Sequence, residues 1–175
     1  MSFSIHKASA PVFTAALTNM LAWVDKAQAS GVDEATMMQA RLAPDMHPFP
    51  FQFQAASDAA KGAVARLSGG EAPKMADDEA SFDALRERLR KTIAYVNSVP
   101  ASAYEGAEER DVELRFPNGM GYAWKGADFL TGFSLPNFFF HVTMAYALLR
   151  ANGVEIGKPD FLQHLGMPNL APPAA

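Results

Sequence analysis

The chain of 175 residues contains no cysteine. This absence excludes disulfide bonds, zinc sites built from thiolates and catalysis by a cysteine nucleophile. Positive charge is also scarce, because 15 lysine and arginine residues stand against 19 acidic residues and give a net charge of −4. A chain without a basic stripe is not expected to bind nucleic acid.

Long apolar runs are absent as well. No window is free of polar residues for long enough to cross a bilayer, and the first residues hold no apolar core of signal-peptide length. Hydrophobic residues nevertheless make up 49% of the chain and charged residues 19%. These proportions are typical of a globular protein rather than a disordered one. We therefore expect a cytoplasmic protein with no membrane partner.

Helical periodicity covers most of the first hundred residues. Apolar side chains at spacings of three and four predict amphipathic helices over residues 5–29, from Phe53 to Leu67 and from Phe82 to Val96. A short helical piece is expected between the first two, over residues 34–41, with Asp33 as its cap. The charged side of the last of these helices indicates a solvated face, formed by Arg86, Glu87, Arg90 and Lys91.

Between residues 111 and 125 the apolar period changes from about 3.6 to 2, which is typical of β-strands. A three-residue loop at Pro117-Asn118-Gly119 places six apolar side chains on one face, by pairing Phe116 with Met120, Leu114 with Tyr122 and Val112 with Trp124. We therefore predict a hairpin with a glycine bulge. Its apolar face is expected to lie on the helices, because an isolated hairpin is marginally stable in water.

Residues 126–153 predict a final helix that is apolar on almost every side, with the sequence GADFLTGFSLPNFFFHVTMAYALLRANG. Its three consecutive residues Phe138, Phe139 and Phe140 cover more than half of the circumference, at about 100° per residue. A helix of this kind is normally buried on all sides. Pro136 removes one backbone hydrogen bond, so a kink is expected between Gly132 and Pro136.

A polar stripe crosses this apolar helix, because spacings of three and four place Ser134, Asn137 and His141 on one face. The proline-rich loop LAPDMHPFPF, residues 42–51, and the start of the helix after it supply further polar groups. Gln52 and Gln54 point in opposite directions, so only one of them faces inward. In helix bundles, inward-facing side chains of neighbouring helices build the binding sites. The candidate ligand-binding residues are Asp45, His47, Gln54, Asn137, His141 and Tyr146.

His141 is the central candidate, as a metal ligand or as a proton donor near neutral pH. The alternative is a buried neutral imidazole that is hydrogen-bonded to Asn137 or to a loop carbonyl. Asp45 and His47 are candidate ligands beside it, but a turn-capping aspartate and an exposed loop histidine explain them equally well. For Tyr146, the alternative is a tether to a neighbouring element.

Three stretches resemble a known family: SIHKASAPVF (4–13), RLAPDMHPFPFQFQAASDAAKGAVARLSG (41–69) and LPNFFFHVTMAYALLRANGVEIGKPDFL (135–162). This family is an uncharacterised bacterial and fungal domain of unknown function within the DinB/YfiT-like superfamily, whose members are regarded as metalloenzymes. The resemblance implies a mainly all-α fold, a DinB-like up-down-down-up four-helix bundle with a β-hairpin between helices 3 and 4. One domain is expected over residues 1–165, with its hairpin at about 111–125, followed by a C-terminal tail, 166–175.

The resemblance also bears on metal binding. Metal-binding members of the superfamily carry one histidine near the start of the second long helix and two more, one turn apart, on the last. His141 matches one of the last pair, but the position one turn later is Ala145, which cannot bind a metal. The second helix has only glutamines near its start. A three-histidine site is therefore not expected, and a weaker site for nickel, zinc or iron would use Asp45, His47 and His141.

These observations lead to three functional hypotheses, and they leave open whether the protein is an enzyme. The first is a DinB-like protein that binds a small molecule in a polar pocket inside the bundle. The second is a divalent-metal-dependent transferase, acting on thiols, or a hydrolase, with His141 as the main ligand. The third is a dimeric structural protein without a ligand. Many superfamily members dimerise through helix faces, so the resemblance and the apolar last helix predict a homodimer with residues 138–140 near its interface.

Overall fold

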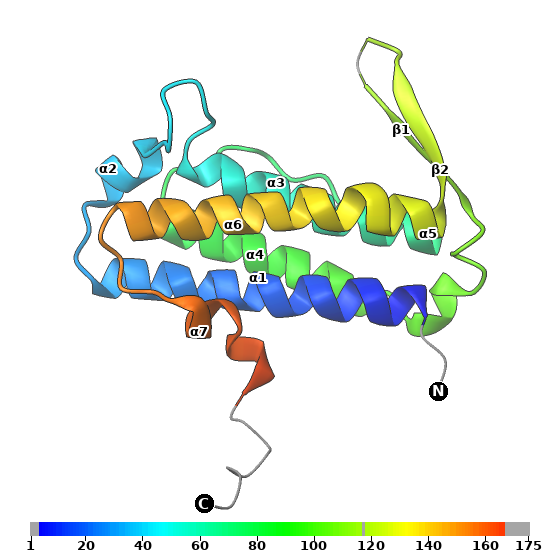
Figure 1. The fold of residues 1–175 in the computed structure, drawn as a ribbon, viewed down its shortest axis with the longest axis horizontal. Coiled ribbons are helices and arrows are strands. Elements are labelled where there is room, and N and C mark those ends of the chain that lie inside the picture. The colour runs from blue at the N-terminus through cyan, green and yellow to red at the C-terminus, as the bar shows by residue number, and fades with distance from the viewer. Residues whose placement is uncertain (1–3, 117, 167–175) are drawn as a thin grey trace, which may run out of the picture.

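Four long helices lie side by side and form the body of the molecule (Figure 1). The computed structural model describes residues 4–116 and 118–166. Its long helices are α1 (Ile5–Ala29), α3 (Phe49–Ser68), α4 (Phe82–Ser98) and α6 (Leu135–Ala151). In Figure 1, α1 and α6 run in one direction while α3 and α4 run in the other. This order confirms the mainly all-α, up-down-down-up four-helix bundle.

Shorter elements connect the long helices. They are α2 (Glu34–Gln39), β1 (Asp111–Arg115), β2 (Gly121–Lys125), α5 (Gly126–Asp128), the π-helix η2 (Phe129–Ser134), α7 (Lys158–Phe161) and the 3₁₀ turns η1 (Ala101–Tyr104) and η3 (Gln163–Leu165). Ser4, Asp33 and Ser81 cap α1, α2 and α4, because each side chain accepts a hydrogen bond from the backbone N–H three residues later. The local sequence thus determines where these three helices begin.

The core lies between the four long helices and is built from their apolar stripes. Phe13 of α1 packs edge-to-face on Phe138 of α6, with ring centroids 4.9 Å apart, and both side chains are fully buried. Burying a large apolar side chain contributes about 1.5–3 kcal/mol. The α6 side that carries Phe140 is not covered, since Phe140 is 54% exposed. Within a single chain, the bundle therefore covers the last helix only in part.

The hairpin has the predicted register. Val112 pairs with Trp124 and Leu114 with Tyr122, and the Phe116 N–H donates to the Met120 carbonyl at 2.7 Å. Gly119 has a φ of +84°, a left-handed conformation that glycine adopts without strain. Pro117 lies outside the described residues.

The prediction that the apolar face of the hairpin lies on the helices was wrong for its outer half. The hairpin stands away from one end of the bundle (Figure 1), so only its base reaches the helices. There, Trp124 stacks on Phe133 with ring centroids 5.4 Å apart. Towards the tip, Met120 and Tyr122 are 66% and 57% exposed.

The last helical segment accommodates its proline through a π-helix rather than a simple kink. Residues Phe129–Ser134 form the π-helix η2, and the Leu135 N–H donates to the Leu130 carbonyl five residues earlier. Pro136 then falls in the first turn of α6, where its missing N–H costs little. Single π-helical turns inside helices occur often at functional sites.

Arg86 of α4 does not lie on a solvated face, as the sequence predicted. Its side chain is 7% exposed, and its guanidinium contacts Asp25 of α1 at 2.6 Å and Asp83 at 2.5 Å. It therefore ties α4 to α1 across the bundle.

The chain after α6 turns back onto α1. Trp23 donates from Nε1 to the Asp160 carbonyl of α7 at 3.2 Å, and Lys26 pairs with the Asp160 carboxylate at 2.5 Å. Residues 167–175, most of the predicted tail, lie outside the described part of the chain.

Across residues 4–116 and 118–166, no helix has the length and apolarity needed to span a membrane.

Candidate functional site

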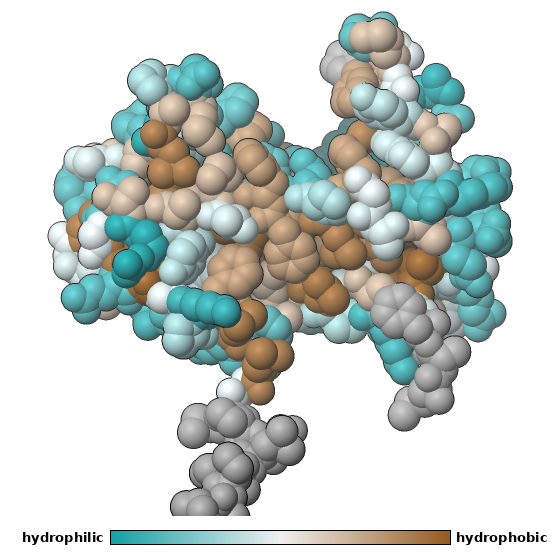
Figure 2. Space-filling view, in the orientation of Figure 1, coloured by the Kyte–Doolittle hydropathy of each residue, from teal (hydrophilic) through white to brown (hydrophobic). Residues whose placement is uncertain are grey.

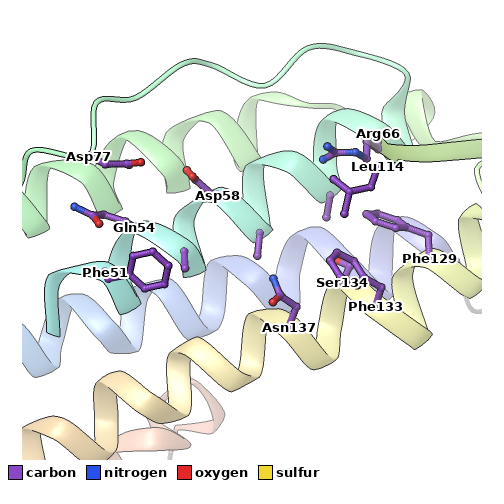
Figure 3. A pocket seen from close by; sticks show the side chains of 13 residues that line it. Phe51, Gln54, Asp58, Arg66, Asp77, Leu114, Phe129, Phe133, Ser134 and Asn137 are labelled. Atoms are coloured by element: carbon purple, nitrogen blue, oxygen red, sulfur yellow. The ribbon is translucent and has the colours of Figure 1, made fainter. Parts of the chain in front are cut away.

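A cavity of about 340 Å³ lies between α3 and the last helical segment. We call it the α3–α6 cavity (Figure 3). Apolar and polar side chains both face it. Its lining consists of Phe51, Gln54, Ala55, Asp58, Ala59, Ala63, Arg66, Asp77, Leu114, Phe129, Phe133, Ser134 and Asn137.

Small side chains and the π-helix explain why this space stays open. Ala55, Ala59 and Ala63 follow one another at a spacing of four, so their short side chains form one face of α3. Across from them, η2 contributes Phe129 and Phe133. Large rings opposite alanines leave a hollow with a mostly apolar surface, which is typical of small-molecule sites.

Part of the predicted polar stripe belongs to this cavity. Asn137 points from α6 toward α3 (Figure 3). Ser134 is 2% exposed, and its hydroxyl has no hydrogen-bond partner among the described residues. Burying such a group unpaired costs about 1–3 kcal/mol. From the α3 side, Gln54 donates to Glu79 Oε2 at 2.9 Å.

Arg88 of α4 holds the acidic rim of the cavity together. Its side chain is 1% exposed, and its guanidinium contacts Asp58 at 2.7 Å, Asp77 at 3.0 Å and Glu79 at 2.9 Å. Burial alone would lower the pKa of Arg88, but the hydrogen bond to Glu79 and the surrounding carboxylates keep that pKa above its ordinary value. Sequence reasoning missed Arg88, although its spacing of three from Leu85 places it beside the apolar stripe of its helix.

His141 lies next to the cavity, on the far side of Phe51. The Phe51 ring contacts the His141 ring edge-to-face at a centroid distance of 5.9 Å and stacks on His47 at 3.8 Å. His141 Nδ1 is 2.9 Å from Gln52 Oε1, and the Gln52 amide donates to the His47 carbonyl at 3.2 Å. The hydrogen-bond partner of His141 is thus Gln52, rather than Asn137 or a loop carbonyl.

This arrangement assigns the protonation of His141. Since the Gln52 Nε2 group donates to a carbonyl, its Oε1 faces the imidazole as an acceptor, and Nδ1 carries the proton. Burial lowers the pKa of His141 below its ordinary value, and nearby His47 adds to this effect. The ring is therefore neutral at pH 7, with its lone pair on Nε2.

The predicted metal ligands are not gathered into a complete site. Within the part of the chain that the structure describes, no three His, Asp or Glu side chains come together in a way that would hold a metal ion. Asp45 and His47 are exposed on the loop before α3, and Ala145, one turn after His141, is fully buried. These residues do not fit a three-histidine centre.

Tyr146 faces a different part of the molecule. Its ring contacts Trp23 and Phe161, with centroids 5.6 and 5.8 Å apart, on the side where α7 covers α1. The structure therefore brings Gln54 and Asn137 together in the α3–α6 cavity and places His47 and His141 beside it. Asp45 and Tyr146 are not among the residues that line the cavity.

Comparison with known proteins agrees with this architecture. A family model described as a domain of unknown function (DUF1993) matches residues 5–162. A crystal structure of a DinB family member from Shewanella denitrificans is 34% identical, with a TM-score of 0.85, and the match covers 96% of each chain. No curated protein matches.

Proposed function

Because the chain belongs to the DUF1993 family of DinB-like domains, for which no activity is assigned, we propose a function from its own cavity: it binds a small molecule between α3 and α6. One observation supports this proposal above the others. The buried Ser134 hydroxyl, which has no hydrogen-bond partner in the described part of the chain, and the Gln54 and Asn137 amides belong to the lining of a mostly apolar cavity. A few convergent polar groups in an apolar hollow are what a specific ligand requires.

His141 and His47 extend this proposed site beyond Phe51. A neutral imidazole with its lone pair on Nε2 accepts a hydrogen bond from a ligand hydroxyl or amide. Gln52 fixes the orientation of the ring through its contact with Nδ1 at 2.9 Å. In this proposal, His141 acts as a hydrogen-bond acceptor, because the lowered pKa favours the neutral ring.

The proposal is tested by filling the cavity. Ala59→Trp places an indole among the lining residues, whereas Ala94→Trp adds the same group on the exposed side of α4. The alanine methyl signals of Ala55 and Ala63 are followed by NMR while a library of small organic fragments is added. We expect fragments that shift both signals in the wild type and in Ala94→Trp, but not in Ala59→Trp. Shifts that persist in Ala59→Trp, or no fragment that shifts either signal, would contradict the proposal.

The metal-dependent hypothesis has one supporting observation. Histidines that bind metals usually donate their other ring N–H to a neighbouring acceptor, as His141 does to Gln52. The described side chains supply too few ligands for a complete centre, so we derive no metal chemistry from them. Elemental analysis of untagged protein distinguishes this second candidate from the first.

A homodimer remains our proposal for the partner of this chain. The α6 side that carries Phe140 leaves this ring 54% exposed, and Figure 2 shows apolar residues gathered across the middle of the face in view. Phe138 is fully buried in its own bundle and is unavailable for an interface. Light scattering after size exclusion is expected to give a dimer for the wild type and a monomer for Phe140→Glu. A monomeric wild type would contradict the proposal.

A further inference from the structure

Arg66 places a positive charge in the lining of the α3–α6 cavity. Three charged side chains line this cavity, and two of them, Asp58 and Asp77, are within 3.0 Å of the Arg88 guanidinium. Arg66 has no acidic partner among residues 4–116 and 118–166; it donates only to the carbonyls of Gly62 and Glu113. Within the described part of the chain, no acidic side chain therefore compensates its half-buried charge.

The hydrogen-bonding pattern leaves part of the guanidinium available. Nε donates to the Glu113 carbonyl at 3.3 Å, and Nη1 donates to the Gly62 carbonyl at 3.0 Å. Of the five N–H groups of an arginine, one on Nη1 and two on Nη2 remain. Donors on both terminal nitrogens match the two oxygens of a carboxylate.

Gly62 makes room for this conformation. An added Cβ at Gly62 would lie 2.7 Å from Nη1 of Arg66, closer than atoms can pack. Gly62 lies in the middle of α3, where glycine costs about 1 kcal/mol relative to alanine. The Arg66 guanidinium occupies the space over it and would have to shift if a Cβ were added.

The surroundings of Arg66 determine what else the ligand must contain. Leu114 and Phe129 lie beside it at one end of the cavity, while Gln54 and Asp77 lie at the other end (Figure 3). A ligand with a single negative charge and an apolar body satisfies both parts of the lining. A second negative charge would meet the acidic rim of Asp58 and Asp77 and be repelled.

We infer that the α3–α6 cavity takes a monocarboxylate with an apolar or aromatic body, and that Arg66, positioned over Gly62, binds the carboxylate. This inference rests on the proposed function and adds the chemical class of the ligand. It assigns no role to the histidines beside Phe51, so the loss of either histidine leaves the preference for carboxylates in place.

Matched pairs of probes test the inference. Benzoate with benzamide, trans-cinnamate with cinnamamide, and hexanoate with hexanamide differ in charge but little in shape. Dissociation constants are measured from the methyl signals of Ala55, Ala59 and Ala63 in the wild type, Arg66→Gln and Gly62→Ala. In the wild type, we expect each acid that binds to have a dissociation constant lower than that of its amide by about tenfold or more. The reason is that hydrogen bonds to a charged group are stronger than neutral ones.

The variants separate the possible outcomes. In Arg66→Gln the preference for the acid should fall to near one, with amide binding unchanged. Gly62→Ala should reduce the preference while the protein remains at least as stable, because alanine favours the helix. Equal binding of acids and amides in the wild type, or a preference that survives Arg66→Gln, would overturn the inference but not the proposed function. Failure of every acid and every amide to bind would also overturn the inference, whereas the proposed function is contradicted only by the fragment experiment described above.

Discussion

Replacing Arg88 by methionine is expected to destabilise the protein by about 3–5 kcal/mol, the cost of removing one partner of a buried ion pair. The magnitude depends on how exposed the partners of Arg88 are. The Asp58 and Asp77 side chains are 48% and 60% exposed, so water solvates them once the cation is gone, and each contributes at most about 1 kcal/mol. Glu79 is 9% exposed and would be left charged with Gln54 as its remaining side-chain partner.

The loss of stability in Arg88→Met should therefore come mainly from the Glu79 carboxylate, which is left without its cation. A double-mutant cycle isolates this contribution. Adding Glu79→Gln to Arg88→Met removes the stranded charge, so the double variant should regain about 1–3 kcal/mol relative to Arg88→Met alone. Urea unfolding at pH 7, followed by circular dichroism, measures each free energy of unfolding. Arg90→Met, on the exposed side of α4, is the matched control and should change stability by no more than about 0.5 kcal/mol.

Acid titration provides an independent check of the same pair. Burial would raise the pKa of Glu79, but hydrogen bonds from Arg88 and Gln54 hold it below its ordinary value of 4.5. The folded state thus releases this proton more readily than the unfolded state, and the resulting stability is present above pH 4.5 and lost as pH falls through the lowered pKa. Between pH 4.5 and the lowered pKa of Glu79, the Glu79→Gln variant should lose less stability than the wild type. If Arg88→Met costs less than about 1 kcal/mol, or if the double variant is no more stable than Arg88→Met, the reasoning is refuted.

Three further predictions concern His141 and the helix start at Ser81. Because burial lowers the pKa of His141 from 6.5, the unfolded state binds its proton first, so wild-type stability should fall as pH drops below 6.5. In His141→Asn, the free energy of unfolding from urea titrations should depend less on pH in this range. An unchanged pH dependence would argue against a lowered pKa of His141. Elemental analysis of untagged, chelator-free protein should show no stoichiometric nickel, zinc or iron, whereas bound metal lost in His141→Ala would favour the metal-dependent hypothesis. Ser81→Ala should cost about 1 kcal/mol through loss of the α4 cap, measured by thermal unfolding, and no change would contradict the cap.

Helix positions and the hairpin register could be predicted because they depend on local patterns. The spacing of apolar residues identified α1 to its ends, Ile5 and Ala29, and alternation around Gly119 identified the pairing of Leu114 with Tyr122. The candidate site was predicted only in part. Gln54 and Asn137 do line one cavity, because α3 and α6 pack against each other and each residue lies on the side of its helix that borders the cavity.

The features that sequence reasoning missed are long-range. Arg88 shares a helix face with Leu85, but its burial depends on three carboxylates that arrive from α3 and from the connection before α4. The tip of the hairpin is exposed because it extends past the end of the bundle. The alternation of apolar residues in the strands does not show where the bundle ends. The partner of His141 proved to be Gln52 because the relative rotation of two packed helices decides which amide faces the ring.

The sequence by itself determined the long helices, the Asp33 cap and the hairpin turn, since each depends on residues within a few positions of one another, and the fold class followed from a resemblance over most of the chain. Only the tertiary structure decided that alanines of α3 face the π-helix across a cavity, and that Arg66 lies over Gly62 with no acidic partner among the residues described. Those properties come from packing between segments distant in the chain, and from side-chain conformations that such packing allows.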